Sequence, residues 1–308
     1  MVRADSNRID RPAAMTALLF AAVVLAWGFT WYAIKLQLGV VAPEVSILWR
    51  FALAAAVMWA GLAATGRLRR GRWRDHRWFA ALGACLFCFN FIFIYKSTGY
   101  MASGIVSVVF TTATLFNALN QWLFLGRRPR PQVVGGAVCG IAGIALLFSA
   151  DLAGLGAPGA GLGLLFGLAG TYVFSLGNLA SMKAGGLGLD LPNVTARGMS
   201  WGVLFLALWS ALRGHAFVIE PTPAYLGSLV YLSVVGSVAG FLAYLALVRR
   251  AGADRAAYAT VAFPVVALTV STVLEGYHWS PLAVLGLPAI LLGNVLVFAP
   301  PLGRRKPA

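Results

Sequence analysis

The sequence has few charged residues and very few acids. Of its 308 residues 11% are charged, and nine Asp and Glu stand against 24 Lys and Arg. A soluble globular domain carries about 25% charged residues. A water-soluble fold of this length could not hide a chain that is 60% hydrophobic. The shortage of charge therefore excludes an ordinary soluble domain and indicates that the solvent is largely lipid.

The apolar stretches also lack the residues of catalytic and metal sites. All nine acids fall in the N-terminal tail, in loops or at predicted helix ends, and the three histidines fall in loops. Cys85 and Cys88 have a CxxC spacing but lie in an apolar run without a second pair, which favours buried thiols over zinc or redox chemistry. We therefore expect no catalytic residue, no metal ion and no cofactor.

What the chain has instead is long apolar stretches. A helix that spans a bilayer needs about 20 mostly apolar residues. The stretches of this kind lie near 13–34, 44–65, 77–96, 102–125, 131–150, 160–182, 192–212, 223–248, 255–274 and 281–300. The loops between them are short, so they leave no room for a soluble catalytic domain. The sequence predicts an all-α polytopic membrane protein with ten transmembrane helices.

The basic residues alternate from loop to loop. Most of them fall in the N-terminus, the C-terminus and every second loop, and the loops between carry Lys35, Lys96 and Arg213. This positive-inside pattern predicts that both termini are cytoplasmic and that the protein lies in a bacterial-type inner membrane. The net charge of +15 is therefore assigned to topology and contact with anionic lipid, and not to nucleic acid.

The two halves of the chain resemble one another when the sequence is shifted by about half its length. Tyr95 then aligns with Tyr244, and Gly143 aligns with Gly293. Because five is odd, a second five-helix copy must cross the membrane in the opposite sense, and an inverted repeat of this kind underlies alternating access. We expect cytoplasmic tails over residues 1–12 and 301–308, with five-helix repeats over 13–150 and 151–300.

Several motifs then point to a family. They are Trp27-Gly-Phe-Thr-Trp-Tyr-Ala-Ile-Lys35 in the first helix, Arg50 in the second, Phe263-Pro264-Val-Val in the ninth and a glycine-rich fifth helix from Gly135 to Phe148. With ten helices and the repeat, the chain resembles the drug/metabolite transporter superfamily of the two-EamA-repeat type, and most of all its aromatic amino-acid exporters. The resemblance implies that eight helices line a cavity and that the fifth and tenth stand outside it.

One proline is a candidate hinge. Pro264, within the ninth helix, removes a backbone hydrogen bond and invites a bend. The fourth helix reads Phe110-Thr-Thr-Ala113 where the superfamily has a proline-centred stretch. This departure speaks against a symmetric pair of hinges.

Polar and aromatic residues inside the apolar stretches are the candidates for a substrate cavity, because polar groups in lipid are costly unless they are paired or face water. Arg50 could contact a substrate carboxylate, or it could be a structural arginine that snorkels or caps carbonyls. The amides and rings could equally join helices or fill the core. The candidates are Trp27, Arg50, Asn90, Tyr95, Asn117, Tyr172, Asn178, Trp201, Ser237 and Tyr244.

Together these features predict a permease that exports small metabolites by alternating access. By resemblance, its substrates are aromatic and other apolar amino acids. With no acid or histidine in mid-membrane, we expect facilitated diffusion or exchange and not tight ion coupling. A multidrug or nucleotide-derivative carrier is the alternative, and a membrane-embedded enzyme on lipid-linked substrates is a remote one. The expected partners are the substrate and the bilayer, and a monomeric state is left open.

Overall fold

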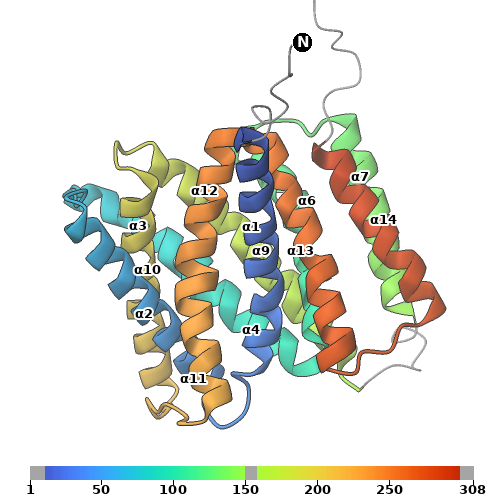
Figure 1. Cartoon of the computed structure of the whole chain (residues 1–308), viewed down its shortest axis with the longest axis horizontal. Helices are drawn as coiled ribbons and strands as arrows, with labels where there is room; N and C mark the ends of the chain where they lie inside the picture. The colour runs from blue at the N-terminus through green and yellow to red at the C-terminus, as the bar shows by residue number, and fades with distance from the viewer. Residues whose placement is uncertain (1–10, 150–157, 299–308) are drawn as a thin grey trace, which may run out of the picture.

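The fold is helical throughout the part of the chain that the structure describes. The computed structural model describes residues 11–149 and 158–298, and these contain helices and no strand (Figure 1). The α-helices are α1 (Arg11–Lys35), α2 (Pro43–Ala64), α3 (His76–Leu82), α4 (Asn90–Tyr100), α5 (Ser103–Phe110), α6 (Ala113–Leu125), α7 (Pro131–Leu147), α9 (Ala160–Gly185), α10 (Leu191–Leu212), α11 (Pro223–Val230), α12 (Gly240–Ala251), α13 (Ala253–Leu274) and α14 (Pro281–Phe298). A 3-10 helix (η1, Trp73–Asp75) and two π-helices (η2, Gly83–Phe89, and η3, Tyr231–Ala239) join some of them. The predicted all-α class is confirmed.

Eight continuous helices are long and apolar enough to cross a membrane. Some of them combine several elements: Trp73–Tyr100 contains η1, α3, η2 and α4, and Pro223–Ala251 contains α11, η3 and α12. The predicted stretches 131–150 and 192–212 fall on α7, an apolar helix of 17 residues, and on α10, a helix of 22 residues that begins with polar groups such as Asn193 and Arg197. Eight of the predicted stretches are therefore confirmed as helices whose length and composition suit a membrane span.

The connections between helices lie on two faces of the molecule (Figure 1). The face that carries the start of α1 also carries the α2–α3, α6–α7 and α12–α13 connections. These connections and the helix ends beside them contain most of the described arginines. We call it the basic face. The opposite face carries the α1–α2, α4–α5, α10–α11 and α13–α14 connections. The alternation of basic loops seen in the sequence is thus an alternation between two faces.

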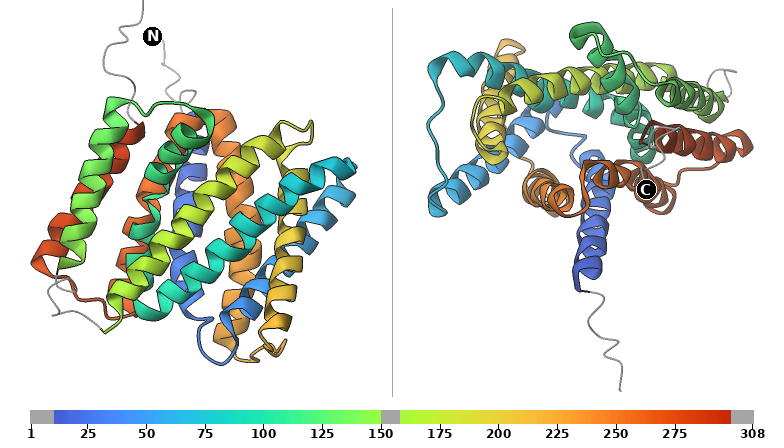
Figure 2. Two further views of the ribbon diagram at one scale, coloured as in Figure 1. Left: turned by 180° about the vertical axis from the view of Figure 1, so that it is seen from behind. Right: turned by 90° about the horizontal axis from the view of Figure 1, so that it is seen from above.

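Helices α7 and α14 form a close antiparallel pair at one end of the molecule (Figures 1 and 2). A Cβ atom added to Gly136 would lie 2.5 Å from the Gly293 oxygen, and one added to Gly143 would lie 2.7 Å from the Gly286 oxygen. The reverse contacts, from Gly293 and Gly286, are both 2.6 Å. Glycines let the two backbones approach this closely. Because the sequence repeat aligns Gly143 with Gly293, the pair joins equivalent helices that run in opposite directions.

The two π-helices occupy matching places in the two halves. η2 separates α3 from α4, and η3 separates α11 from α12. In each half the aligned tyrosine, Tyr95 or Tyr244, lies in the α-helix that follows. A π-helix rotates the side chains that come after it and is frequent at functional sites. Because η2 and η3 stand at the same place in each half, they belong to the scaffold that the two repeats share.

The fourth apolar stretch is interrupted even though it has no proline. α5 ends at Phe110 and α6 begins at Ala113. The hydroxyls of Thr111 and Thr112 donate to the carbonyls of Val108 and Val109, each at 2.7 Å. Side-chain bonds of this kind compete with regular helix bonds and bend helices. α13, in contrast, continues through Pro264, which stays a predicted hinge.

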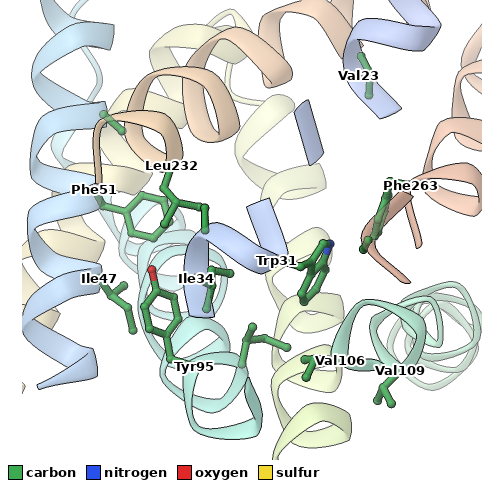
Figure 3. Close-up of a cluster of buried hydrophobic side chains, with 14 of the residues drawn as sticks. Val23, Trp31, Ile34, Ile47, Phe51, Tyr95, Val106, Val109, Leu232 and Phe263 are labelled. Carbon is green, nitrogen blue, oxygen red and sulfur yellow. The ribbon is translucent and has the colours of Figure 1, made fainter. Parts of the chain in front are cut away.

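The core gathers around the C-terminal half of α1, whereas the N-terminal half leans out of the bundle (Figure 2). Trp31 and Ile34 of α1 meet side chains from both halves in one buried cluster (Figure 3). Phe51 and Tyr95 come from the first half, and Phe263 comes from the second. The packing around α1 therefore joins the two halves into one body.

Gly136→Ala should destabilise the α7–α14 pair. The new Cβ would lie 2.5 Å from a backbone oxygen, so the helices must move apart, at a cost of about 1–3 kcal/mol. Thermal unfolding in detergent should show a lower Tm. Gly135→Ala is the matched control, because a Cβ added there meets nothing within 4 Å. Equal Tm values for the two variants would contradict the close approach.

Candidate functional site

The centre of the candidate site is Arg50 on α2. Its side chain is 4% exposed. Nε donates to Ser237 Oγ at 3.2 Å, and the guanidinium lies 4.5 Å from the ring centroid of Phe91 and 5.1 Å from that of Phe51. Nη1 has no hydrogen-bond partner among the described residues. Because a buried charge is costly unless it is paired, this free donor makes Arg50 a candidate contact for an anion.

The π-helix η3 receives contacts from both α1 and α2. The indole nitrogen of Trp27 donates to the Gly236 oxygen at 3.2 Å, and the next residue, Ser237, accepts from Arg50. Ser237 in turn donates to the Leu232 oxygen at 2.8 Å, five residues back, which is the π-helical spacing. A side chain at Gly236 would press on α1, since an added Cβ would lie 2.7 Å from the Thr30 side chain.

Aromatic and amide groups surround this centre. The Trp27 and Tyr244 rings lie 5.2 Å apart. Tyr95 is fully buried, its hydroxyl donates to Gln37 Oε1 at 2.7 Å, and it interacts electrostatically with Arg50. In Figure 3 its ring points from α4 toward Phe51. The structure thus brings together Trp27, Arg50, Tyr95, Ser237 and Tyr244 from the predicted candidates.

Three other candidates lie along the seam between α6 and α9. Asn178 donates to Asn117 Oδ1 at 3.1 Å, and the Tyr172 ring packs edge-on against Phe116 at 5.4 Å. Nearby, Asn120 donates to Ser175 Oγ at 2.9 Å. A cavity of about 310 Å³ opens beside the asparagine pair, lined also by Gln121 and Ser181. These amides both join two helices and border a cavity.

Of the last two candidates, Trp201 lies near the basic face, and Asn90 directly precedes Phe91, whose ring packs on Arg50. Trp201 donates to His76 Nδ1 at 3.2 Å and lines a second cavity, of about 350 Å³, near the basic face. Asn90 is buried at the start of α4, where a Cβ on Gly170 of α9 would lie 2.9 Å from its backbone oxygen. Its Oδ1 has no partner among the described residues.

Sequence reasoning missed a polar cluster that joins the halves at the opposite face. The Glu275 carboxylate accepts from the Ser103 backbone N–H at 3.0 Å, from the Ser103 hydroxyl, and from Ser271 Oγ at 2.6 Å. The Gly104 N–H donates to Ser271 Oγ at 2.7 Å. An anion at the end of α13 thereby caps the start of α5. The only sequence signal was an acid at a helix end.

Sequence reasoning also left Trp31 out of the candidate list, although it lies within the quoted first-helix motif. Its ring lies 5.3 Å from Phe110 and 6.0 Å from Phe263. α5 packs along α13, whereas α6 packs mainly against α9. The break at Thr111 and Thr112 therefore lies where the fourth stretch leaves α13, on the side toward the basic face.

Comparison with known proteins shows the family of this chain. Residues 14–149 and 161–299 each match the profile of the EamA-like transporter family. The chain belongs to that family. The double match confirms the internal repeat, and a family of transporters with several apolar helices makes the protein a multi-pass membrane transporter.

Relatives of this EamA-family transporter span nearly its whole length. The uncharacterized transporter YvbV of Bacillus subtilis is 25% identical over 91% of this chain and 90% of its own. The inner membrane transporter YedA of Escherichia coli K12 is 27% identical over 91% of this chain and 89% of its own. A probable terminal-alkyne amino-acid exporter of Streptantibioticus cattleyicolor is 27% identical over 92% of this chain and 94% of its own.

A solved crystal structure shares the fold of this EamA-family transporter. The TM-score is 0.64 at 20% identity, and the match covers 92% of this chain and 97% of the other.

Glu275→Ala should open the contact between α5 and α13. Loss of the carboxylate leaves the Ser103 N–H and two hydroxyls without their acceptor, so the opposite face should loosen. Labelling by a membrane-impermeant maleimide at Ser107→Cys, one turn into α5, should become several-fold faster in a background without the native cysteines. Glu220→Ala is the control, because that acid bonds only the nearby Thr222 among the described residues. Equal labelling rates would contradict the role of the cluster.

Proposed function

We propose that this EamA-family transporter exports small metabolites, and specifically aromatic and other apolar amino acids. The observation that carries the proposal is the buried Arg50 with its unpaired Nη1. A carboxylate can accept two hydrogen bonds from a guanidinium, and such pairs are strong. The surrounding rings of Trp27, Phe91 and Tyr244 offer faces to an apolar or aromatic side chain.

The relatives support the substrate class. The printed name of the Streptantibioticus cattleyicolor relative describes an amino-acid exporter, at 27% identity. An amino acid presents one carboxylate, and Arg50 offers one buried guanidinium. A cationic drug, the cargo of the rival multidrug reading, would meet an uncompensated positive charge at this site. Arg50 therefore favours the amino acid.

The proposed architecture is ten spanning helices in two inverted five-helix repeats, over residues 13–150 and 151–300. In this arrangement α7 and α10 cross the membrane with the eight long apolar helices. The antiparallel α7–α14 pair supports the inversion. The basic face would be cytoplasmic, with the tails 1–12 and 301–308 on the same side, because arginine-rich loops stay inside.

The proposed cycle is alternating access between the two faces. The Ser103–Ser271–Glu275 cluster holds α5 against α13 at the opposite face. Nearer the basic face, α6 leaves α13 and packs against α9. A substrate would therefore enter from the cytoplasm on that side, past Asn117 and Asn178. Release would require α5 and α13 to part, with Pro264 and the break at Thr111 as the points that bend.

Transport is proposed to be facilitated or to proceed by exchange. No described carboxylate lies within 4 Å of Arg50, and the described salt bridges are at the ends of helices. A relay for proton coupling normally needs a buried ionisable pair.

Purified protein in liposomes should take up aromatic and apolar amino acids down their own gradient. Efflux or counterflow of labelled phenylalanine, with competition by a panel of amino acids, measures this directly. Imposed pH or sodium gradients should not drive accumulation. If no amino acid moves or competes, the substrate proposal fails, and accumulation driven by a pH gradient would refute the uncoupled mechanism.

Arg50→Met should weaken the apparent affinity for amino acids by about tenfold or more, since a charge-assisted hydrogen bond contributes about 1.5–3 kcal/mol. Arg50→Lys keeps the charge and should retain part of the affinity. The deciding comparison is competition by phenylalanine and by phenylethylamine, which lacks the carboxylate. Only phenylalanine should compete less well against Arg50→Met. An equal loss for both compounds would assign Arg50 a structural role.

A further inference from the structure

The second cavity lies outside the proposed substrate route. It has a volume of about 350 Å³ and is bordered by α2, α3, α10 and the loop between α2 and α3. Its walls include Trp59, Arg70, His76, Arg197, Ser200 and Trp201. These elements lie at the end of the molecule farthest from α7 and α14, on the side of the basic face (Figures 1 and 2). We call it the basic-face cavity.

One wall is a buried arginine that is held rigidly. Arg197 is 8% exposed. Its Nη1 donates to Asn193 O at 2.9 Å and to Asn193 Oδ1 at 3.1 Å, and its Nη2 donates to the Arg69 oxygen. The guanidinium lies 5.1 Å from the Trp59 ring centroid and 5.8 Å from that of Phe79. These hydrogen-bond partners are neutral, so Arg197 is fixed in place without a salt bridge among the described residues, although the nearby Asp190 attracts it electrostatically.

The loop that carries Arg70 is fastened over the same cavity. Arg67 forms a 2.7 Å salt bridge with Asp190, and Asn193 bonds both the Arg67 oxygen, at 2.8 Å, and the Arg69 N–H, at 3.1 Å. Partial burial raises the pKa of Asp190, but hydrogen bonds from Asn193 and Arg67 outweigh it and lower that pKa. Asp190 therefore stays ionised and keeps its salt bridge with Arg67. The exposed Arg70 is then available to bind a ligand.

The remaining polar groups of the wall offer donors. His76 Nδ1 accepts from Trp201 Nε1, so a neutral imidazole carries its proton on Nε2 and donates from there. Ser200 accepts from Trp59 at 2.9 Å and donates to the Ala196 oxygen at 2.9 Å, so its proton is already used. Two guanidinium groups and one imidazole N–H suit an anion with several oxygens, and arginine suits phosphate well.

The surroundings place this cavity at the surface of the membrane. Next to it in the loop, Trp73 is 84% exposed and Leu68 is 54% exposed. Exposed apolar side chains of this kind anchor a protein at headgroup level, and basic pockets between spanning helices bind phosphate headgroups. Lipid phosphates are thus available at the position of the cavity, whichever face is cytoplasmic.

We propose that the basic-face cavity is a binding site for a phosphate anion, supplied by the headgroup of an anionic phospholipid. Arg70 and Arg197 contact the phosphate oxygens, His76 donates a further hydrogen bond, and the Trp59 and Trp201 rings flank the glycerol end. A soluble phosphate would use the same donors, and the test below separates the two sources.

The test compares Arg70→Gln with Arg128→Gln in the full-length protein. Arg70 and Arg128 are both exposed arginines in connections of the basic face, so neither change endangers folding. Lipid retention is measured by native mass spectrometry after reconstitution in phosphatidylcholine with and without phosphatidylglycerol. Arg70→Gln should retain phosphatidylglycerol about tenfold more weakly, as for loss of one charge-assisted contact. Arg128→Gln should retain it as the parent protein does.

A second measurement uses inorganic phosphate, titrated calorimetrically into the protein in phosphatidylcholine alone. Binding that depends on Arg70, without selective retention of phosphatidylglycerol, would confirm the anion site and assign it to soluble phosphate. If Arg70→Gln matches the parent with both probes, the proposal is overturned. It is equally overturned if Arg70→Gln and Arg128→Gln lose lipid to the same extent, since the attraction would then be a property of the whole face.

Discussion

A lipid bilayer offers no water to the polar groups of a helix, so the protein must satisfy them itself. Most of the described structure obeys this constraint by local means. Serine and threonine hydroxyls donate back to carbonyls one turn earlier, as at Thr171 and Ser233, and asparagines pair across helices. The few buried atoms without a partner among the described residues include Arg50 Nη1 and Gln37 Nε2. Gln37 bonds Tyr95, which also interacts with Arg50. The others are Asn90 Oδ1, Asn120 Oδ1 and Ser210 Oγ, which lie on α4, α6 and α10. Of these atoms Arg50 Nη1 alone belongs to a cation, so it gains most from an anionic ligand.

The repeat supplies the scaffold but not this chemistry. π-helices, aligned tyrosines and the glycine contacts of α7 and α14 occur in both halves. Under the same alignment the position of Arg50 is occupied by Met199, which is buried in α10. Likewise Ser237 of η3, the acceptor for Arg50, corresponds to the buried Cys88 of η2. The polar site is therefore asymmetric inside a pseudo-symmetric frame, as expected if a substrate with one carboxylate binds in one orientation.

The sequence was sufficient to predict features that depend on composition and order. Apolar length located eight helices that are long and apolar enough to span a membrane, and the offset between the halves revealed the repeat. An arginine in the middle of an apolar stretch made Arg50 a candidate site residue. The η2 and η3 segments could not be predicted, because a π-turn is decided by how neighbouring helices pack. The Thr111–Thr112 break could not be predicted either, because paired threonines also occur in regular helices. The Glu275 cluster joins residues that are far apart in the chain, so only the tertiary structure reveals that this acid caps α5.

α2 connects the two sites, since it carries both Arg50 and Trp59. These residues are nine positions apart, which corresponds to about 13 Å along a helix. α2 packs along α10, and α10 in turn packs on η2, where a Cβ on Gly83 would lie 2.7 Å from the Gly198 oxygen. A contact this close leaves the helices little freedom to slide independently, so α2, α10 and η2 should move as a unit.

A ligand in the basic-face cavity would influence transport only if it bound the two access states with different affinity. One wall of that cavity is the loop that Asp190 and Asn193 fasten to α10. The two states could differ in affinity for the ligand only if this loop shifted relative to α10. The hydrogen bonds that hold the loop oppose such a shift. The cavity is therefore better suited to anchoring this end of the protein at the membrane surface while the helices around α1 move.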